Sequence, residues 1–149
     1  MTELGARLGK AVQPGDVIAL VGDLGVGKTV LAQGLARGLG VPDDVPITSP
    51  TFTLINVYEH GRLILHHTDL YRLEKAAELE HVGLWDLYRG DGVVVVEWFD
   101  RFPEIAPREW LELRIAHIPG REDARTVQIV AHGAAGTRLA QVVQGARSP

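Results

Sequence analysis

Hydrophobic residues of this 149-residue chain fall into patterns that predict its strands and helices. Residues 17–21 (Val-Ile-Ala-Leu-Val) form a continuous apolar run between turn signals, and residues 93–96 are four successive valines. Uninterrupted apolar runs of this length are typical of parallel strands that are buried on both faces. We therefore predict two central strands, with Glu97 standing at the end of the second one.

Apolar positions at helical spacing predict a helix on either side of the first strand. Thr2 is a candidate cap for the first helix, whose apolar positions lie between residues 4 and 12. A second helix follows the glycine-rich segment 22–27. Gly34 and Gly38 weaken this helix intrinsically, so packing must help to hold it.

The remaining patterns predict a mixed sheet. Residues 52–58 and 62–68 are typical of two strands joined by a hairpin turn, and residues 73–88 predict one or two helices. Residues 111–115 and 127–131 alternate between apolar and polar side chains, with one break in the second run. This alternation favours half-exposed antiparallel strands.

Composition and charge narrow the functional classes. The chain has 15 basic and 19 acidic residues, a net charge of -4, whereas proteins that grip nucleic acid directly usually carry a basic excess. Cysteine is absent, which excludes disulfides and thiolate metal sites. Because the sequence has neither an apolar run long enough for a bilayer nor a secretion signal at its start, we expect a cytoplasmic protein without a membrane partner.

The glycine-rich segment has the spacing of a phosphate-binding loop, Gly-four residues-Gly-Lys-Thr. It consists of Gly22, Asp23, Leu24, Gly25, Val26, Gly27, Lys28 and Thr29. The glycines let successive backbone N–H groups, including that of Val30, turn around an anion at the positive end of the following helix. Lys28 can reach the terminal phosphates of a nucleoside triphosphate, and the Thr29 hydroxyl can ligate Mg²⁺.

The predicted fold class is therefore α/β, a P-loop NTPase-like three-layer fold with parallel core strands extended by antiparallel strands. One domain is expected over residues 1–149, in which residues 134–149 form a short helix and a loose tail. A chance glycine-rich turn and a dinucleotide-binding loop are the competing interpretations. The strand before the loop, the helix after it and the Lys-Thr pair favour a triphosphate site.

Two acidic residues at strand ends are candidates for the chemistry. Glu97 follows the four valines and is predicted to be the second protein ligand of Mg²⁺, beside Thr29. Asp69 follows another apolar stretch and is predicted to orient water or a water-bound metal; the alternatives are a surface charge or a helix cap. His66 and His67 point to opposite faces of a strand, so a hydrogen-bonding role is favoured over a zinc site, and His67 could share a face with Asp69.

Residues 49–53 (Ser-Pro-Thr-Phe-Thr) offer hydroxyl groups on a proline-fixed loop, which suits a segment that senses the terminal phosphate. Thr51 is the candidate catalytic hydroxyl in it; an ordinary loop entering a strand is the alternative. Trp98 is either a core residue or part of a partner-facing surface. A small-molecule kinase and a non-catalytic nucleotide sensor remain alternatives to an ATPase. No guanine-reading Asn-Lys-x-Asp segment is present.

Four segments in this order resemble the TsaE (YjeE) family, the P-loop ATPases of bacterial tRNA threonylcarbamoyladenosine (t6A) biosynthesis. They are the phosphate loop 22–29, Ser-Pro-Thr-Phe-Thr-Leu at 49–54, His-Thr-Asp-Leu-Tyr-Arg-Leu at 67–73 and Val-Glu-Trp at 96–98. The phosphate loop is common to many families, whereas the Asp-Leu-Tyr-Arg and Glu-Trp segments make the match specific. The resemblance runs from about Leu4 to Trp98.

The resemblance implies an ATPase that binds ATP or ADP with Mg²⁺ on Thr29 and Glu97, uses Asp69 in hydrolysis and has a switch-like segment containing Thr51. It also implies slow turnover alone and action with TsaD and TsaB, the partners that transfer the threonylcarbamoyl group, so that tRNA is reached only through that complex. The sequence departs from the family pattern at two points. This chain begins almost directly at its first predicted helix, where many members have a further segment at the nucleotide pocket. Val30 also replaces a hydroxyl residue.

Overall fold

A computed structural model describes residues 1–50, 53–81 and 83–145 of the chain. In chain order the elements are α1 (Thr2–Ala11), β1 (Val17–Val21), α2 (Lys28–Gly38), β2 (Ile55–Tyr58), β3 (Leu65–Asp69), α3 (Ala77–His81), α4 (Leu84–Arg89), β4 (Val93–Glu97), the 3₁₀ turns η1 (Phe99–Arg101) and η2 (Pro103–Ile105), β5 (Trp110–Ile118), β6 (Arg121–His132) and α5 (Gly133–Gly145). The two central strands and the predicted helices are confirmed.

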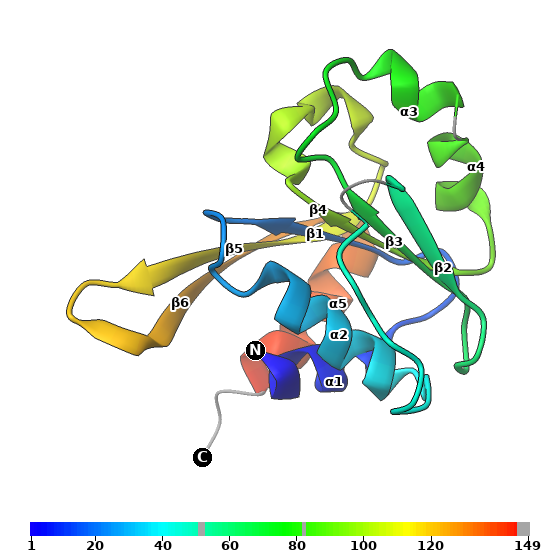
Figure 1. Ribbon diagram of the computed structural model, residues 1–149. Helices are drawn as coiled ribbons and strands as arrows, with labels where there is room; N and C mark the ends of the chain where they lie inside the picture. Colours follow the sequence, from blue (N-terminus) through cyan, green and yellow to red (C-terminus); the bar gives the residue numbers. More distant parts are fainter. Residues whose placement is uncertain (51–52, 82, 146–149) are drawn as a thin grey trace.

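Within this described part, the strands form one sheet in the order β2-β3-β4-β1-β5-β6. The pairs β3–β4, β4–β1 and β1–β5 are parallel, and the edge strands β2 and β6 are antiparallel to their neighbours. The prediction of a parallel core extended by antiparallel strands is confirmed. Figure 1 shows how the β5–β6 hairpin projects beyond the rest of the sheet.

One strand was predicted correctly only in part. Residues 111–115 were expected in a half-exposed antiparallel strand, but β5 runs parallel to β1 on one side and antiparallel to β6 on the other. Leu111, Leu113 and Ile115 are buried, and so is Glu112 between them. Arg114 is exposed as the alternation predicts, whereas the buried Glu112 accepts a bond from Arg114 at 2.6 Å. In β6 Ala131 is exposed, so it does not share the half-buried state of Val127 and Ile129.

Helices cover both faces of the sheet and produce the three layers (Figure 1). The α1, α2 and α5 helices lie against one face, where Ile18 and Leu20 of β1 join their core cluster. On the other face Val17 and Ala19 pack with apolar residues of α3, α4, η1 and η2. Because successive side chains of a strand point to opposite faces, the continuous apolar run of β1 serves both clusters at once.

Glycines bring α1 and α2 into backbone contact. A Cβ atom placed on Gly5 would lie 2.2 Å from the Leu31 carbonyl oxygen, and one on Gly34 would lie 2.2 Å from the Thr2 carbonyl oxygen. Gly9 and Gly38 repeat this contact one turn further along each helix. This packing explains how α2 tolerates the two glycines that weaken it.

The predicted cap of α1 is wrong. Thr2 is already the first helical residue, because the Gly5 N–H bonds to the carbonyl of Met1 and moves the start of the helix one residue back. The C-terminal helix α5, at 13 residues, is longer than the short helix that was expected, and residues 146–149 of the predicted tail lie outside the described residues. Arg138 anchors α5 with bonds of 2.5 and 2.7 Å to the buried Asp16 carboxylate.

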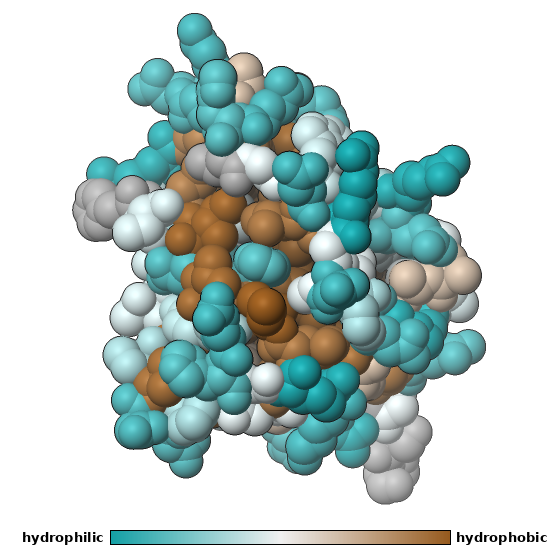
Figure 2. Space-filling view, turned by 90° about the vertical axis from the view of Figure 1, so that its right-hand side faces the viewer, coloured by the Kyte–Doolittle hydropathy of each residue, from teal (hydrophilic) through white to brown (hydrophobic). Residues whose placement is uncertain are grey.

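Two observations concern the surface. None of the helices in the described ranges combines the length and apolar character that crossing a membrane requires. Figure 2 shows apolar side chains gathered on the side where β2 forms the sheet edge. Val57 and Ile64, in and beside the β2–β3 hairpin, are 49% and 41% exposed.

Candidate nucleotide-binding site

The glycine-rich segment connects the end of β1 to the start of α2, as a phosphate loop requires. Gly27 precedes the first helical residue, Lys28, and has a φ of 122°, a conformation that side chains with a Cβ rarely adopt. Gly22 has no room for a side chain, because a Cβ there would lie 2.5 Å from the Ile115 carbonyl oxygen. Gly27 is therefore required by the backbone conformation, and Gly22 is required by the lack of space for a side chain.

Lys28 is 4% exposed, and its ammonium group lies within the loop. Its Nζ donates to the carbonyl oxygens of Gly22 and Asp23 at 2.5 and 2.9 Å, and it stands 3.9 Å from the centre of the Trp98 ring. Burial lowers the pKa of Lys28, while the carboxylates of Glu97 and Asp69 oppose this effect. The ammonium group is therefore held by the loop backbone, and Lys28 lines the same cavity as the two predicted acids.

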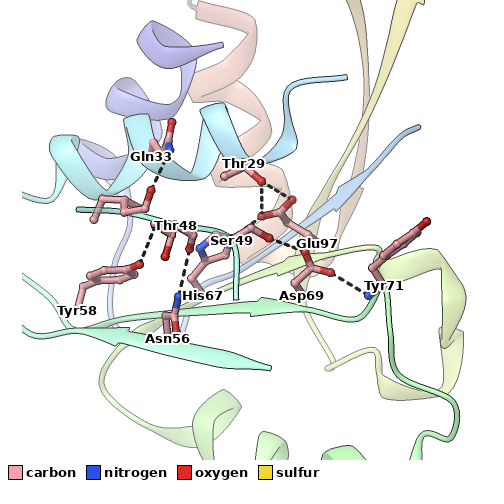
Figure 3. Close-up of polar contacts among 11 residues, drawn as sticks. Thr29, Gln33, Thr48, Ser49, Asn56, Tyr58, His67, Asp69, Tyr71 and Glu97 are labelled. Carbon is pink, nitrogen blue, oxygen red and sulfur yellow. Dashed lines mark hydrogen bonds and ion pairs between the residues drawn. The ribbon is translucent and has the colours of Figure 1, made fainter. Parts of the chain in front are cut away.

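Thr29 and Glu97 meet across the site, as Figure 3 shows. The Thr29 hydroxyl lies 3.0 and 3.1 Å from the two carboxylate oxygens of Glu97, although 68 residues separate them in the chain. Glu97 is only 2% exposed, and one of its oxygens is also 2.5 Å from Nε2 of His67. Two predicted metal ligands, one on α2 and one at the end of β4, thus lie together.

Asp69 stands beside Glu97 in the sheet, at the register position directly opposite it. One of its carboxylate oxygens accepts a bond from the Ser49 hydroxyl and the other accepts one from the Tyr71 backbone N–H, both at 2.8 Å (Figure 3). The bond from Tyr71, two residues on, fixes the carboxylate against its own backbone. Its orientation is therefore set by both the chain before β2 and the chain after β3.

The loop that leads to Ser49 is fastened on both sides. The Gln33 amide of α2 donates to the Ile47 carbonyl at 2.8 Å, and the Asn56 amide of β2 donates to the Thr48 carbonyl at 3.1 Å. These bonds hold the start of the predicted switch segment between helix and sheet. The predicted hydroxyl of Thr51 lies outside the described residues.

A cavity of about 310 Å³ joins these groups. Its walls are formed by Leu24, Gly25, Gly27, Lys28, Thr29, Val30, Ser49, Asp69, Tyr71, Glu97 and Trp98. Gly22 and Asp23 contribute through their carbonyl bonds to Lys28, and Val26 is buried beneath the loop. The structure therefore brings the predicted loop, Asp69 and Glu97 to one place.

Three contributors were not assigned to the site from the sequence. Trp98 turns its ring to Lys28 with a left-handed backbone, φ 60°, that is uncommon for a bulky residue. Tyr71 packs on that ring, with 4.8 Å between the ring centres. Arg125 of β6 donates from Nε to the Val26 carbonyl at 2.9 Å across 99 residues. No local sequence signal points to a contact over such a separation.

The donor set suits a nucleotide with Mg²⁺. Mg²⁺ prefers oxygen ligands and is usually held by one or two protein oxygens together with substrate phosphates. The Thr29 hydroxyl and the Glu97 carboxylate supply such oxygens on the cavity wall. Leu24, Gly25 and Gly27 line the same cavity beside the first turn of α2, where backbone N–H groups and the helix dipole favour an anion.

Comparison with known proteins places the chain in a family. The model of a family described as "Threonylcarbamoyl adenosine biosynthesis protein TsaE" matches residues 1–127. The chain belongs to the TsaE family. Two curated TsaE proteins, both named tRNA threonylcarbamoyladenosine biosynthesis protein TsaE, are similar to it. The Nostoc protein is 43% identical over 130 residues, covering 85% of this chain and 76% of the relative. The Bacillus subtilis protein is 43% identical over 121 residues, covering 81% and 73%.

A solved structure agrees with the TsaE assignment. The crystal structure of Bacillus subtilis YdiB superposes with a TM-score of 0.78 at 33% identity, covering 99% of this chain and 88% of that one. The α/β fold expected from the sequence is therefore shown independently. The family match also extends beyond Trp98, where the resemblance seen in the sequence weakened, through β5 and into β6.

Proposed function

We propose that this TsaE-family chain binds ATP with Mg²⁺, hydrolyses ATP slowly and serves t6A modification of tRNA together with TsaD and TsaB. One observation carries the proposal: Lys28, Thr29, Asp69 and Glu97 surround a single cavity at the phosphate loop. These groups come from three different elements, and a purely structural turn would not require their convergence.

The loop and the start of α2 bind the phosphates. Backbone N–H groups and the positive end of α2 attract the anion, and Lys28 exchanges its carbonyl partners for phosphate oxygens. Thr29 and Glu97 are the residues that would hold Mg²⁺. When bound, the ion neutralises charge that develops on the phosphate oxygens.

Asp69 is proposed to orient the attacking water. Its two carboxylate oxygens are held by Ser49 and Tyr71 but keep further lone pairs that can accept a hydrogen bond from water. The water oxygen then bonds to the terminal phosphorus while the bond between that phosphorus and the oxygen of ADP breaks, and the proton that the water loses passes to a phosphate oxygen. Such positioning, rather than covalent chemistry, is how phosphoryl-transfer sites in general accelerate reaction.

The place in t6A biosynthesis rests on the family. The relatives are named for that process, and a net charge of -4 favours reaching tRNA through partners over binding it directly. ATP turnover would then act on the TsaD–TsaB complex rather than on RNA.

The experiment measures phosphate release from ATP with Mg²⁺, alone and with TsaD–TsaB. We expect slow release that the partners stimulate, and a large loss in Asp69→Asn while nucleotide affinity remains. Asp91→Asn is the matched control, because that acid is exposed in the turn before β4, at the other end of the strand from Glu97. The absence of nucleotide binding, transfer of phosphate to a metabolite, or full t6A formation with Asp69→Asn would each reject the ATPase proposal.

A further inference from the structure

His67 is a buried histidine with no role in the proposed chemistry so far. It lies in β3, is 0% exposed, and its Nε2 atom is 2.5 Å from a carboxylate oxygen of Glu97. Figure 3 shows the ring between the sheet and the Glu97 carboxylate. A buried imidazole costs free energy unless its polar atoms are satisfied, so its one observed partner calls for an explanation.

The sheet register makes this contact. His67 pairs with Val95, and Asp69 pairs with Glu97, on adjacent parallel strands. Alternation places His67, Asp69 and Glu97 on the face toward α2, while His66 faces the other way. The position of His67 is therefore fixed by two buried strands rather than by a flexible loop.

The contact joins an imidazole nitrogen to a buried carboxylate. Glu97 accepts a hydrogen bond from the Thr29 hydroxyl, and a carboxylate that is itself buried needs donors on its remaining lone pairs. The contact suits an arrangement in which Nε2–H of His67 donates and the Glu97 oxygen accepts. Nδ1 has no partner among the described residues, so no second contact pulls the ring away from Glu97.

We propose that His67 is a positioning residue, which holds the Glu97 carboxylate in the orientation that a divalent cation requires. This inference rests on the proposed function, because it assumes that Thr29 and Glu97 hold Mg²⁺. Thr29 is itself a proposed ligand, so among the described residues that bond to Glu97, only His67 can support the carboxylate from outside the metal site. Removal of a residue that hydrogen-bonds to a metal ligand typically lowers metal affinity 10- to 100-fold.

Two amide substitutions test this directly. Glutamine places its NH₂ group near the position of Nε2, so His67→Gln keeps a donor for Glu97. Asparagine places its NH₂ group near Nδ1, so His67→Asn keeps a polar amide but loses the donor at the required point. His66→Gln is the matched control, since it changes the neighbouring histidine on the opposite face.

The measurement is calorimetric affinity for a non-hydrolysable ATP analogue, first with a chelator and then across a Mg²⁺ titration. We expect all four proteins to bind the analogue equally without Mg²⁺. In His67→Asn the Mg²⁺ concentration that gives half of the affinity gain should rise about 10- to 100-fold. His67→Gln should stay within a few-fold of the wild type, and His66→Gln should match it.

The possible failures can be told apart. Equal Mg²⁺ dependence of His67→Asn and the wild type overturns the positioning role, and so does equal impairment of the Asn and Gln variants. Loss of affinity already in chelator indicates a packing role, which also overturns it. If the wild-type chain itself gains no affinity from Mg²⁺, the proposed function fails and not merely the role of His67.

Discussion

The glycine contact between α1 and α2 yields a quantitative prediction for Gly34→Ala. Alanine is the better helix former by about 1 kcal/mol, so an isolated α2 would gain stability from this change. In the folded protein the new Cβ would lie 2.2 Å from the carbonyl oxygen and 2.9 Å from the carbonyl carbon of Thr2. Both atoms belong to backbone, which cannot rotate aside as a side chain can.

The helices must therefore separate by about 1 Å, an overpacking that costs roughly 3 kcal/mol at the upper end of its usual range. Subtracting the gain in helix propensity leaves a net loss of about 2 kcal/mol in the free energy of unfolding. For a chain of this size, such a loss lowers the melting temperature by roughly 4–8 °C. Urea and thermal denaturation followed by circular dichroism measure both quantities.

Gly145→Ala is the matched control, because Gly145 ends α5 and a Cβ there would meet nothing within 4 Å. This variant should equal or slightly exceed the wild type in stability. If Gly34→Ala is also as stable as the wild type, the helices do not touch through their backbones and the reasoning is wrong. Lys28 and Thr29 lie in the first turn of α2, so we also expect weaker nucleotide affinity in Gly34→Ala.

Three further predictions concern single side chains. Burial lowers the pKa of Lys28, so the unfolded chain keeps this proton to a higher pH than the folded chain does. The free energy of unfolding should therefore rise with pH until the pH reaches the ordinary lysine pKa of 10.5. Urea denaturation at alkaline pH should show this rise in the wild type and not in Lys28→Met. Burial likewise lowers the pKa of His66 from 6.5, so stability should fall as the pH drops below 6.5, and His66→Gln should fall less in acid denaturation. Arg125→Ala removes the bond to Val26 and should weaken nucleotide affinity roughly 5-fold, the equivalent of about 1 kcal/mol, in calorimetry; unchanged affinity would show that the bond does not shape the loop.

The sequence predicts those features that depend on short-range signals. The apolar runs at 17–21 and 93–96 lie between turn residues and are long enough to identify buried strands. The phosphate loop has its chemistry within eight consecutive residues, 22–29. Glu97 could be predicted as a metal ligand because the end of a buried parallel strand is where P-loop proteins place a metal-binding acid, and the structure confirms its place at the end of β4.

Other features depend on pairings that alternation alone cannot specify. The alternation of apolar and polar residues in β5 does not reveal whether its neighbour is parallel or antiparallel. It also does not reveal that Glu112 accepts a bond from Arg114 and is buried. The bond from His67 to Glu97 depends on the register between β3 and β4, and the bond from Arg125 to the loop depends on how far the hairpin reaches. Thr2 has the right residue type for a cap but lies one position too late.

The long sequence separations in the site have a consequence for synthesis on the ribosome. A nascent chain that has emerged only as far as α2 contains the whole phosphate loop, yet Glu97 is 68 residues beyond Thr29 and Arg125 is 99 residues beyond Val26. Because β1 lies between β4 and β5, its own neighbours in the sheet are also made late. If the chain binds nucleotide as proposed, the complete site forms only when the chain is nearly complete, and nucleotide can stabilise the fold only from that point on.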